Sequence, residues 1–274
     1  MKNRYIVGVL GAGNMGEALI KGLLRSQLVR SYEIIASARR TKRLKLLETT
    51  YGIHTTPDNV SLVESAHTLI LGIKPQDMKA VAAEIAKKLT ADHVVISIAA
   101  GVDLAKLKTL FGNKAKLVRV MPNLPALIDA GVSAICCAKE MPERDRRFAH
   151  QIFQAVGQTI DIRNEKLMDV ITALSGTGPA YFFAMMEAMR DAAEKLGLDP
   201  KLALRMTVQT ALGAAAIAAQ DGADPEKLRE RVTSKKGTTW AAMKVFENRQ
   251  FWKTIEEAMK AAVQRSKELR STKE

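Results

Sequence analysis

A glycine-rich turn, Gly11 to Gly16, follows an apolar run from Tyr5 to Leu10 and precedes a helical pattern. This order predicts a buried strand, a tight turn and a helix. Gly11 can adopt the backbone angles of the turn, Gly13 lets the main chain approach a pyrophosphate, and Gly16 lets the helix pack close to the strand. N–H groups at the start of that helix would bind phosphates. We therefore expect a dinucleotide site, the alternative being an ordinary glycine turn.

Apolar runs and helical patterns then alternate up to residue 163. Further strands are predicted at 32–38, 67–73, 93–99, 116–122 and 130–138. Those at 67–73, 93–99 and 116–122 read as continuous, largely apolar runs, as expected when both faces of a parallel sheet are covered. In doubly wound sheets, ligands bind beyond the carboxyl ends of the strands. Here those ends carry Ile73–Gln76, Ala99–Gly101 and Met121–Asn123. We expect these three segments to share one rim.

From residue 164 nearly all of the chain has a helical period, with breaks at 176–179, 197–200, 222–225 and 235–237. The segment 202–219 is apolar nearly all round, which is more than a bundle of this size can bury. We therefore expect these helices to pack against a second chain. The predicted fold class is α/β: a Rossmann-type, doubly wound parallel sheet in residues 1–163, followed by an all-helical dimerisation domain in residues 164–274.

The composition argues against several other classes of protein. No apolar run reaches the roughly 18 to 20 residues that span a bilayer, and the first residues lack a signal-peptide cleavage site, so we expect a cytoplasmic protein. The net charge of +13 is scattered, without aromatic stacking residues, which favours a solvated basic surface over nucleic-acid binding. Cys136 and Cys137 are adjacent, apolar in context and without metal-ligand spacing, so we expect core residues and no metal site.

The end of the second predicted strand favours NADP over NAD. An NAD-binding protein usually carries Asp or Glu here for the ribose hydroxyl, whereas this chain reads Ser37-Ala38-Arg39-Arg40 with no acid in reach. The hydroxyl of Ser37 and the guanidinium groups of Arg39 and Arg40 could donate to a 2′-phosphate. The alternative is that both arginines merely begin an exposed helix.

Two helical segments contain polar and glycine residues where a bundle would place leucine. The first, ALSGTGPAY (173–181), predicts a sharp break between helices, which without a ligand is only a corner. In the second, residues 228–247, the chain turns at Lys236-Gly237, and Thr238-Thr239 begin the next helix. The N–H donors of such a helix start could bind a carboxylate, unless Thr238 is only an N-cap.

The chain resembles the pyrroline-5-carboxylate reductases nearly from end to end. The matching motifs are VGVLGAGNMG, GIKPQ, SIAAGV, RVMPNLPALIDAG, ALSGTGPAY and LRERVTSKKGTT. The resemblance implies NADPH-dependent reduction of the cyclic imine 1-pyrroline-5-carboxylate to L-proline, the last step of proline biosynthesis. It also implies a homodimer through the helical domain, which several members extend to a ring of dimers. Two departures stand out: Ser234-Lys235-Lys236-Gly237 replaces the usual Ser-Pro-Gly-Gly, and Thr177 replaces a common Ser.

The resemblance also implies the roles of individual residues. The substrate carboxylate would bind the N–H groups of Gly237, Thr238 and Thr239, while the Thr239 hydroxyl, the expected catalytic group, contacts the ring nitrogen. No acid–base pair is needed, because pyrroline is basic enough to arrive as an iminium. Ser234, Ser175 and Thr177 complete the expected substrate site. The expected cofactor residues are Gly11, Ala12, Gly13, Asn14, Met15, Ser37, Arg39, Arg40, Asn59, Ile73, Lys74, Pro75, Ala99, Ala100 and Asn123, with the nicotinamide near Ile73, Lys74 and Ala100.

Two alternatives remain open. A related imine or β-hydroxyacid reductase shares this plan but usually carries a catalytic Lys in its linking helix, and ALSGTGPAY contains none. A non-catalytic, regulatory paralogue of the same fold is the other alternative, and it is raised by Lys235 and Lys236 beside the expected carboxylate site.

Overall fold

The computed structural model describes residues 4–271, and the chain divides into two compact units. Of the described residues, 4–177 and 262–271 form the sheet unit, and 178–261 form the helical unit. The composition changes at residue 164, whereas the contacts assign residues 164–177 and the end of the last helix to the sheet unit.

The strands of the described chain form one eight-stranded sheet in the order β3-β2-β1-β4-β5-β6-β7-β8. They are β1 (Tyr5–Leu10), β2 (Ile34–Ser37), β3 (His54–Thr56), β4 (Ala66–Leu71), β5 (Val94–Ser97), β6 (Lys116–Met121), β7 (Gly131–Cys137) and β8 (Gly157–Asp161). All neighbouring strands are parallel except β6 and β7. The predicted doubly wound parallel sheet is therefore confirmed apart from this one pair.

The antiparallel pairing of β7 with β6 was not expected from the sequence. A parallel neighbour requires a crossover connection of about a dozen residues or more. Residues 122–130 are too few for one, and they form a 3₁₀ turn, Leu124–Ile128, that ends at Asp129 with a φ of 64°. The chain therefore reverses direction at this point.

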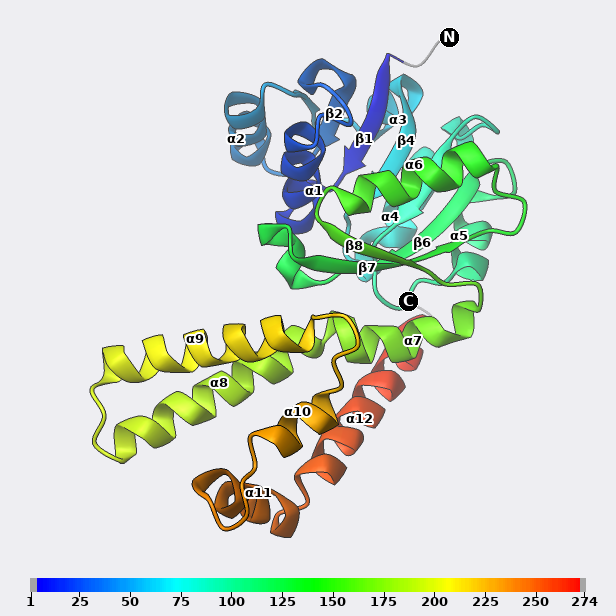
Figure 1. The fold of residues 1–274 in the computed structure, drawn as a ribbon. Coiled ribbons are helices and arrows are strands. Elements are labelled where there is room, and N and C mark those ends of the chain that lie inside the picture. Colours follow the sequence, from blue (N-terminus) through cyan, green and yellow to red (C-terminus); the bar gives the residue numbers. More distant parts are fainter. Residues whose placement is uncertain (1–3, 272–274) are drawn as a thin grey trace. The chain divides into compact units, whose positions relative to one another are not determined.

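Helices cover both faces of the sheet (Figure 1). Helices α1 (Asn14–Arg25), α2 (Thr41–Tyr51) and α6 (Glu143–Gln154) contribute to one hydrophobic core, and α3 (Asn59–Ser65), α4 (Met78–Ile85) and α5 (Leu104–Phe111) contribute to the other. Successive strand residues alternate between these cores: Val94 and Ile96 lie in the first, and Val95 lies in the second. This double burial explains the continuously apolar strand sequences.

The helical part of the chain begins with α7 (Met168–Ile171) and a π-helical segment, Thr172–Gly176, both in the sheet unit. The helical unit then contains α8 (Gly178–Lys195), α9 (Pro200–Ala218), α10 (Pro225–Arg231), α11 (Thr238–Asn248) and the first part of α12 (Phe251–Ser271). Helices α8 and α9 lie side by side (Figure 1). Gly197, with a φ of 97°, ends α8, and the Asp199 carboxylate caps α9 by accepting from the N–H of Leu202.

The helical unit buries almost none of its own apolar residues. Among residues 178–261, only Gly178, Ala203 and Thr207 are buried. Phe182 on α8 is 68% exposed and Leu212 on α9 is 62% exposed. An apolar surface of this kind marks an interface. Among the helices of residues 4–271, none is both long enough and apolar enough to cross a membrane.

The packing of the sheet unit predicts how two isoleucines differ. Ile152 on α6 is fully buried, whereas Ile128 is 75% exposed. Ile152→Ala removes packed methyl and methylene groups and should lower the free energy of unfolding by about 2 to 5 kcal/mol. Ile128→Ala, the matched control, should change it by at most about 0.5 kcal/mol. Urea unfolding measures both values, and equal losses would contradict this description of the core.

Candidate active site

The glycine turn after β1 is held against the ends of two neighbouring strands. Gly11 has a φ of 76°, which favours glycine, and a Cβ added there would lie 2.6 Å from Ile73 Cγ2. The N–H groups of Gly11 and Ala12 donate to the carbonyl oxygen of Ser37 at 3.1 and 2.9 Å. The N–H of Gly72 donates to Leu10 O at 2.8 Å. These bonds fasten the turn to β2 and to the end of β4.

The start of α1 presents an open cradle. Gly13 is the N-cap residue, and no side chain accepts the N–H groups of the first turn as a cap. A Cβ added to Gly13 would meet only Gly11 O, at 3.9 Å, so the backbone is open to a ligand. The first helical residues are Asn14 and Met15, and their N–H groups lie at the positive end of the helix dipole. This geometry fits a pyrophosphate.

Arg43 on α2 holds this turn in place through hydrogen bonds, a role that the sequence did not indicate. Its Nε donates to Ala12 O at 2.8 Å and its Nη2 donates to Gly13 O at 3.0 Å. The same Nη2 pairs with Glu17 Oε2 at 2.6 Å, and Glu17 Oε1 accepts from the Tyr51 hydroxyl at 2.9 Å. Arg43 lies in a basic helical segment where nothing local distinguishes it from its neighbours, so only the folded chain reveals this role.

The residues expected to bind a 2′-phosphate have different environments. Ser37 is buried, and its Oγ donates to Asn59 Oδ1 at 2.6 Å. The Arg39 side chain is exposed and forms an ion pair with Asp77. Arg40 is exposed and precedes the first residue of α2. The structure thus brings Ser37 and Asn59 together at the end of β2, while the role of the two arginines stays a prediction.

The remaining expected cofactor residues follow the carboxyl ends of β4, β5 and β6. Lys74 precedes a 3₁₀ turn that begins at Pro75. Ala99 is buried, and Ala100 is half-buried. Asn123 has a structural partner, because its Oδ1 accepts from the N–H of Val132 at 2.9 Å. All of them lie on the predicted rim.

The segment ALSGTGPAY contains a π-helical segment, so the predicted sharp corner between helices is wrong in form. The Thr177 N–H and hydroxyl both donate to Thr172 O, at 2.8 and 3.1 Å, which closes the wide turn. A Cβ added to Gly176 would overlap Met121 Cε, so the segment lies against the end of β6. Ser175, which is half-buried, is therefore on the rim. Single π-helical turns often occur at functional sites.

The second segment expected to bind substrate lies within the helical unit, between α10 and α11. Lys236 has a φ of 61°, and Gly237 is the N-cap residue of α11 without a side-chain cap. The interpretation of Thr238 as the N-cap is therefore wrong. The Gly237 N–H donates to Ser234 O at 3.0 Å, so the N–H groups of Thr238 and Thr239 are the ones that could bind an anion at this helix start.

The cysteines are packing residues. Cys136 is buried, as expected, and Cys137 packs partly buried against the core. Burial raises the pKa of both thiols to about 11, so neither is a thiolate nucleophile near neutral pH. Within residues 4–271, no group of three or more His, Cys, Asp or Glu side chains could hold a metal ion.

Lys236 occupies a backbone conformation that suits glycine. A left-handed conformation costs a residue with a Cβ about 1 to 2 kcal/mol. Glycine loses roughly 0.5 to 1 kcal/mol through the entropy of the unfolded chain. We therefore expect Lys236→Gly to raise the free energy of unfolding by about 0.5 kcal/mol. Lys235→Gly is the matched control, because Lys235 lacks a positive φ, and it should lower stability. Denaturant titration compares the two, and a loss for both would contradict the assignment of strain.

Comparison with known proteins places these features in one family. Residues 165–269 match the family model described as pyrroline-5-carboxylate reductase dimerisation, and residues 6–101 match that described as NADP oxidoreductase, coenzyme F420-dependent. A pyrroline-5-carboxylate reductase from Pseudomonas aeruginosa is 41% identical over 96% of each chain.

Solved structures agree with this match. One of a pyrroline-5-carboxylate reductase from Coxiella burnetii has a TM-score of 0.89 and 35% identity, over 98% of this chain and all of that one. A Plasmodium falciparum pyrroline carboxylate reductase, described with NADP bound, has a TM-score of 0.88 and 28% identity, over 98% and 99% of the two chains. The cradle at α1, the rim and the helical motifs thus occur in a chain that belongs to the pyrroline-5-carboxylate reductase family.

Proposed function

We propose that this protein reduces 1-pyrroline-5-carboxylate to L-proline, with NADPH as the cofactor. The single observation that carries the proposal is the match to the family over 96% of the chain, through the helical segment as well as the sheet. A dinucleotide-binding turn alone would not identify the substrate, because many reductases share such a turn. The proposal includes a boundary between the two domains after residue 163. The family model of the dimerisation domain, whose match begins at residue 165, supports this boundary.

In this proposal NADPH binds along the carboxyl rim of the sheet. Gly11, Ala12, Gly13, Asn14 and Met15 hold the pyrophosphate, which the open cradle at Gly13 supports. Ser37, Asn59, Arg39 and Arg40 hold the ribose and its 2′-phosphate, while Ile73, Lys74, Pro75, Ala99, Ala100 and Asn123 surround the nicotinamide end. When bound, the cofactor supplies a hydride.

The polar groups of the helical motifs would hold the substrate. The N–H groups of Thr238 and Thr239 bind its carboxylate at the start of α11, as their uncapped state supports. The Thr239 hydroxyl accepts a hydrogen bond from the protonated ring nitrogen, and Ser234, Ser175 and Thr177 are the further substrate residues of the proposal. As C5 gains hydride, the π pair of the C=N bond moves to nitrogen, and the product is a secondary amine. The protein therefore contributes mainly position and orientation.

An assay of purified protein tests the proposal. NADPH absorbance should fall when pyrroline-5-carboxylate is added, and proline should accumulate in equal amount. Activity confined to open-chain imines or β-hydroxyacids would support the related reductases instead. A folded protein that binds NADPH and turns over none of these substrates would support the non-catalytic paralogue.

If Arg39 and Arg40 contact the 2′-phosphate, removing them should weaken the binding of NADPH but not of NADH. Each charge-assisted contact to phosphate contributes about 1.5 to 3 kcal/mol. The double variant Arg39→Ala, Arg40→Ala should therefore raise the KM for NADPH about tenfold or more and leave the KM for NADH nearly unchanged. Lys42→Ala with Lys45→Ala is the charge-matched control, because both lysines are exposed on α2. Equal weakening of the two cofactors by the arginine variant would refute the assignment.

The role of Thr239 predicts a defect in chemistry rather than in cofactor binding. Loss of a hydrogen bond to a charged nitrogen costs roughly 1.5 to 3 kcal/mol, so Thr239→Ala should lower kcat/KM for pyrroline-5-carboxylate about ten- to a hundredfold. The KM for NADPH should not change. Thr239→Ser, which keeps the hydroxyl, should retain most of the activity. Steady-state kinetics measure all three, and parental kcat/KM in the alanine variant would remove Thr239 from the mechanism.

The exposed apolar faces of α8 and α9, together with the dimerisation model, support a homodimer through the helical domain, with rings of dimers as a further assembly. Light scattering should find no folded monomer at micromolar concentration. Leu212→Glu should shift the protein towards smaller, less stable species, while Gln209→Glu, an equal charge change on an exposed residue of α9, should not. A parent protein that is a stable monomer would contradict this assembly.

We also propose a cytoplasmic location without a nucleic-acid or membrane partner. The free thiols of Cys136 and Cys137 support a reducing compartment.

A further inference from the structure

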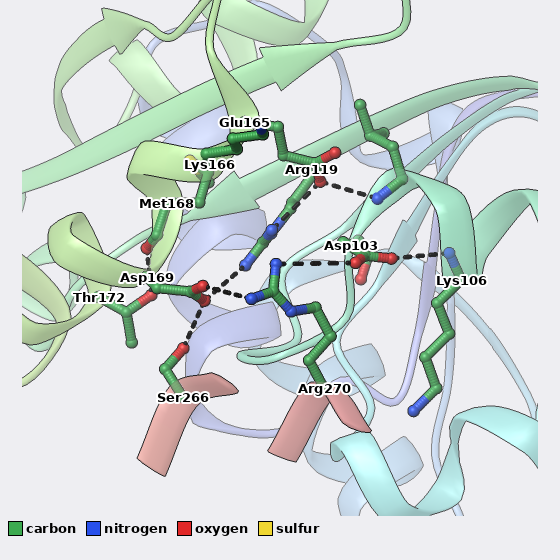
Figure 2. A network of polar contacts seen from close by, with 12 residues as sticks. Asp103, Lys106, Arg119, Glu165, Lys166, Met168, Asp169, Thr172, Ser266 and Arg270 are labelled. Carbon is green, nitrogen blue, oxygen red and sulfur yellow. Dashed lines mark hydrogen bonds and ion pairs between the residues drawn. The ribbon is translucent and has the colours of Figure 1, made fainter. Parts of the chain in front are cut away.

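The C-terminal turns of α12 bind one buried carboxylate with two side chains (Figure 2). Ser266, itself buried, donates through its hydroxyl to Asp169 Oδ1 at 2.9 Å, and Arg270 Nη2 donates to Asp169 Oδ2 at 2.8 Å. Asp169 lies on α7 and is only 2% exposed. Both of its oxygens are therefore bound by a helix that is about one hundred residues further along the chain.

Asp169 is the centre of a larger set of charges, the arginine–carboxylate cluster of Asp103, Arg119, Glu165, Asp169 and Arg270 (Figure 2). Arg119 on β6 is 2% exposed; its Nη1 donates to Glu165 Oε1 at 3.1 Å, and its Nη2 lies 3.9 Å from Asp169 Oδ1. Arg270 Nη1 lies 3.9 Å from Asp103 Oδ2. Buried charges require such partners, because removal of one leaves the others unpaired.

The cluster also reaches the beginning of α5. Asp103 caps this helix by accepting from the N–H of Lys106 at 2.7 Å, and Glu165 accepts from the N–H of Leu104 at 2.8 Å. Val102 and Asp103 connect the loop Ala99–Gly101 to helix α5. Gly101 has a φ of 72°, and a Cβ there would lie 2.9 Å from Leu269 Cβ, so α12 packs directly on this loop. The loop contains two of the proposed cofactor residues.

The same cluster adjoins the second functional segment of the sheet unit. Asp169 is three residues before Thr172, where the π-helical segment with Ser175 begins. The Thr172 hydroxyl donates to Met168 O at 2.7 Å, which links the segment to α7. Contacts that hold Asp169 in place therefore also hold α7, the helical turn that continues into the π-helical segment containing Ser175.

We propose that the end of α12 is a positioning element for hydride transfer, with Arg270 as its principal positioning residue. Arg270 holds α7 through Asp169 and the loop–α5 junction through Asp103, so the two segments keep a common spacing on the rim. This inference rests on the proposed function for the identity of the two segments. The side chain of Arg270 contacts Asp169 and Asp103, neither of which is proposed to touch substrate or cofactor, so it acts through others.

The test compares two arginines of one helix. Arg270→Met removes the bridging guanidinium, and Arg265→Met removes an exposed one, whose partner is Glu268 on the surface. Both variants lose one positive charge and gain the same side chain. The measurements are the NADPH dissociation constant, kcat and KM for pyrroline-5-carboxylate, and the melting temperature, with kinetics recorded well below the melting temperature of each variant.

Arg270→Met should lower kcat by roughly tenfold or more and weaken NADPH binding several-fold, because small displacements of positioning groups are costly in rate. Arg265→Met should stay within about twofold of the parent. Arg270→Lys should recover part of the kcat, since one ammonium can pair with Asp169 but cannot span both carboxylates as a guanidinium does.

A variant Arg270→Met with a lower melting temperature but parental kcat and NADPH affinity would overturn the inference, because the cluster would then only stabilise the fold. If this variant does not fold, Ser266→Ala takes its place: a reduced kcat at an unchanged melting temperature supports the inference, and parental kcat overturns it. A parent that binds NADPH but does not reduce pyrroline-5-carboxylate would contradict the proposed function alone. In that case the NADPH dissociation constant, measured without substrate, still tests the inference. Arg270→Met should bind NADPH several-fold more weakly than the parent, and Arg265→Met should not.

Discussion

The carbonyl group of Ser37 accepts two hydrogen bonds from the turn at Gly11, and the geometry of the sheet unit's rim depends on this contact. It joins the ends of β1 and β2 at the point where α1 begins. The turn needs a positive φ at Gly11, and Arg43 on α2 donates hydrogen bonds to the backbone carbonyls of Ala12 and Gly13. Because these hydrogen bonds hold the first turn of α1 in place, its N–H donors point in one direction, as an anion site requires.

The rim is assembled from segments that are distant in the sequence. The antiparallel reversal before β7 and the contact of Gly176 with Met121 bring the π-helical segment to the end of β6. The buried charges around Asp169 then tie α7 and α5 to the end of α12. Apolar packing alone is not directional, whereas hydrogen-bonded ion pairs specify which helix end meets which loop. Orientation at this rim therefore depends on a few polar contacts within a largely apolar unit.

The two units differ in how they reach stability. The sheet unit buries apolar residues on both faces of its sheet, while the helical unit leaves large side chains such as Phe182 and Leu212 exposed. Exposed apolar area of this extent is unfavourable in water, so the helical unit depends on a partner surface. This dependence follows from the sequence pattern of α9, which is apolar on most of its circumference.

The amino-acid sequence by itself determined the elements and the class of fold, because these follow from local patterns. Continuous apolar runs predict doubly covered strands, and Gly11 to Gly16 predicts a strand, turn and helix, all of which the structure confirms. The family motifs likewise predicted the membership that the comparisons confirm. The roles of the individual site residues, Thr239 among them, stay predictions.

Only the tertiary structure decided which distant side chains meet. Arg43 is 30 positions from Gly13, and Arg270 is 101 positions from Asp169, so no local pattern distinguishes these arginines from the many exposed ones. The direction of β7, the π-helical form at Thr172–Gly176 and the left-handed conformation of Lys236 were also unpredicted. The physical reason is common to all of them: each conformation is selected by contacts or chain closure in the folded protein, where tertiary energies override the local preferences of single residues.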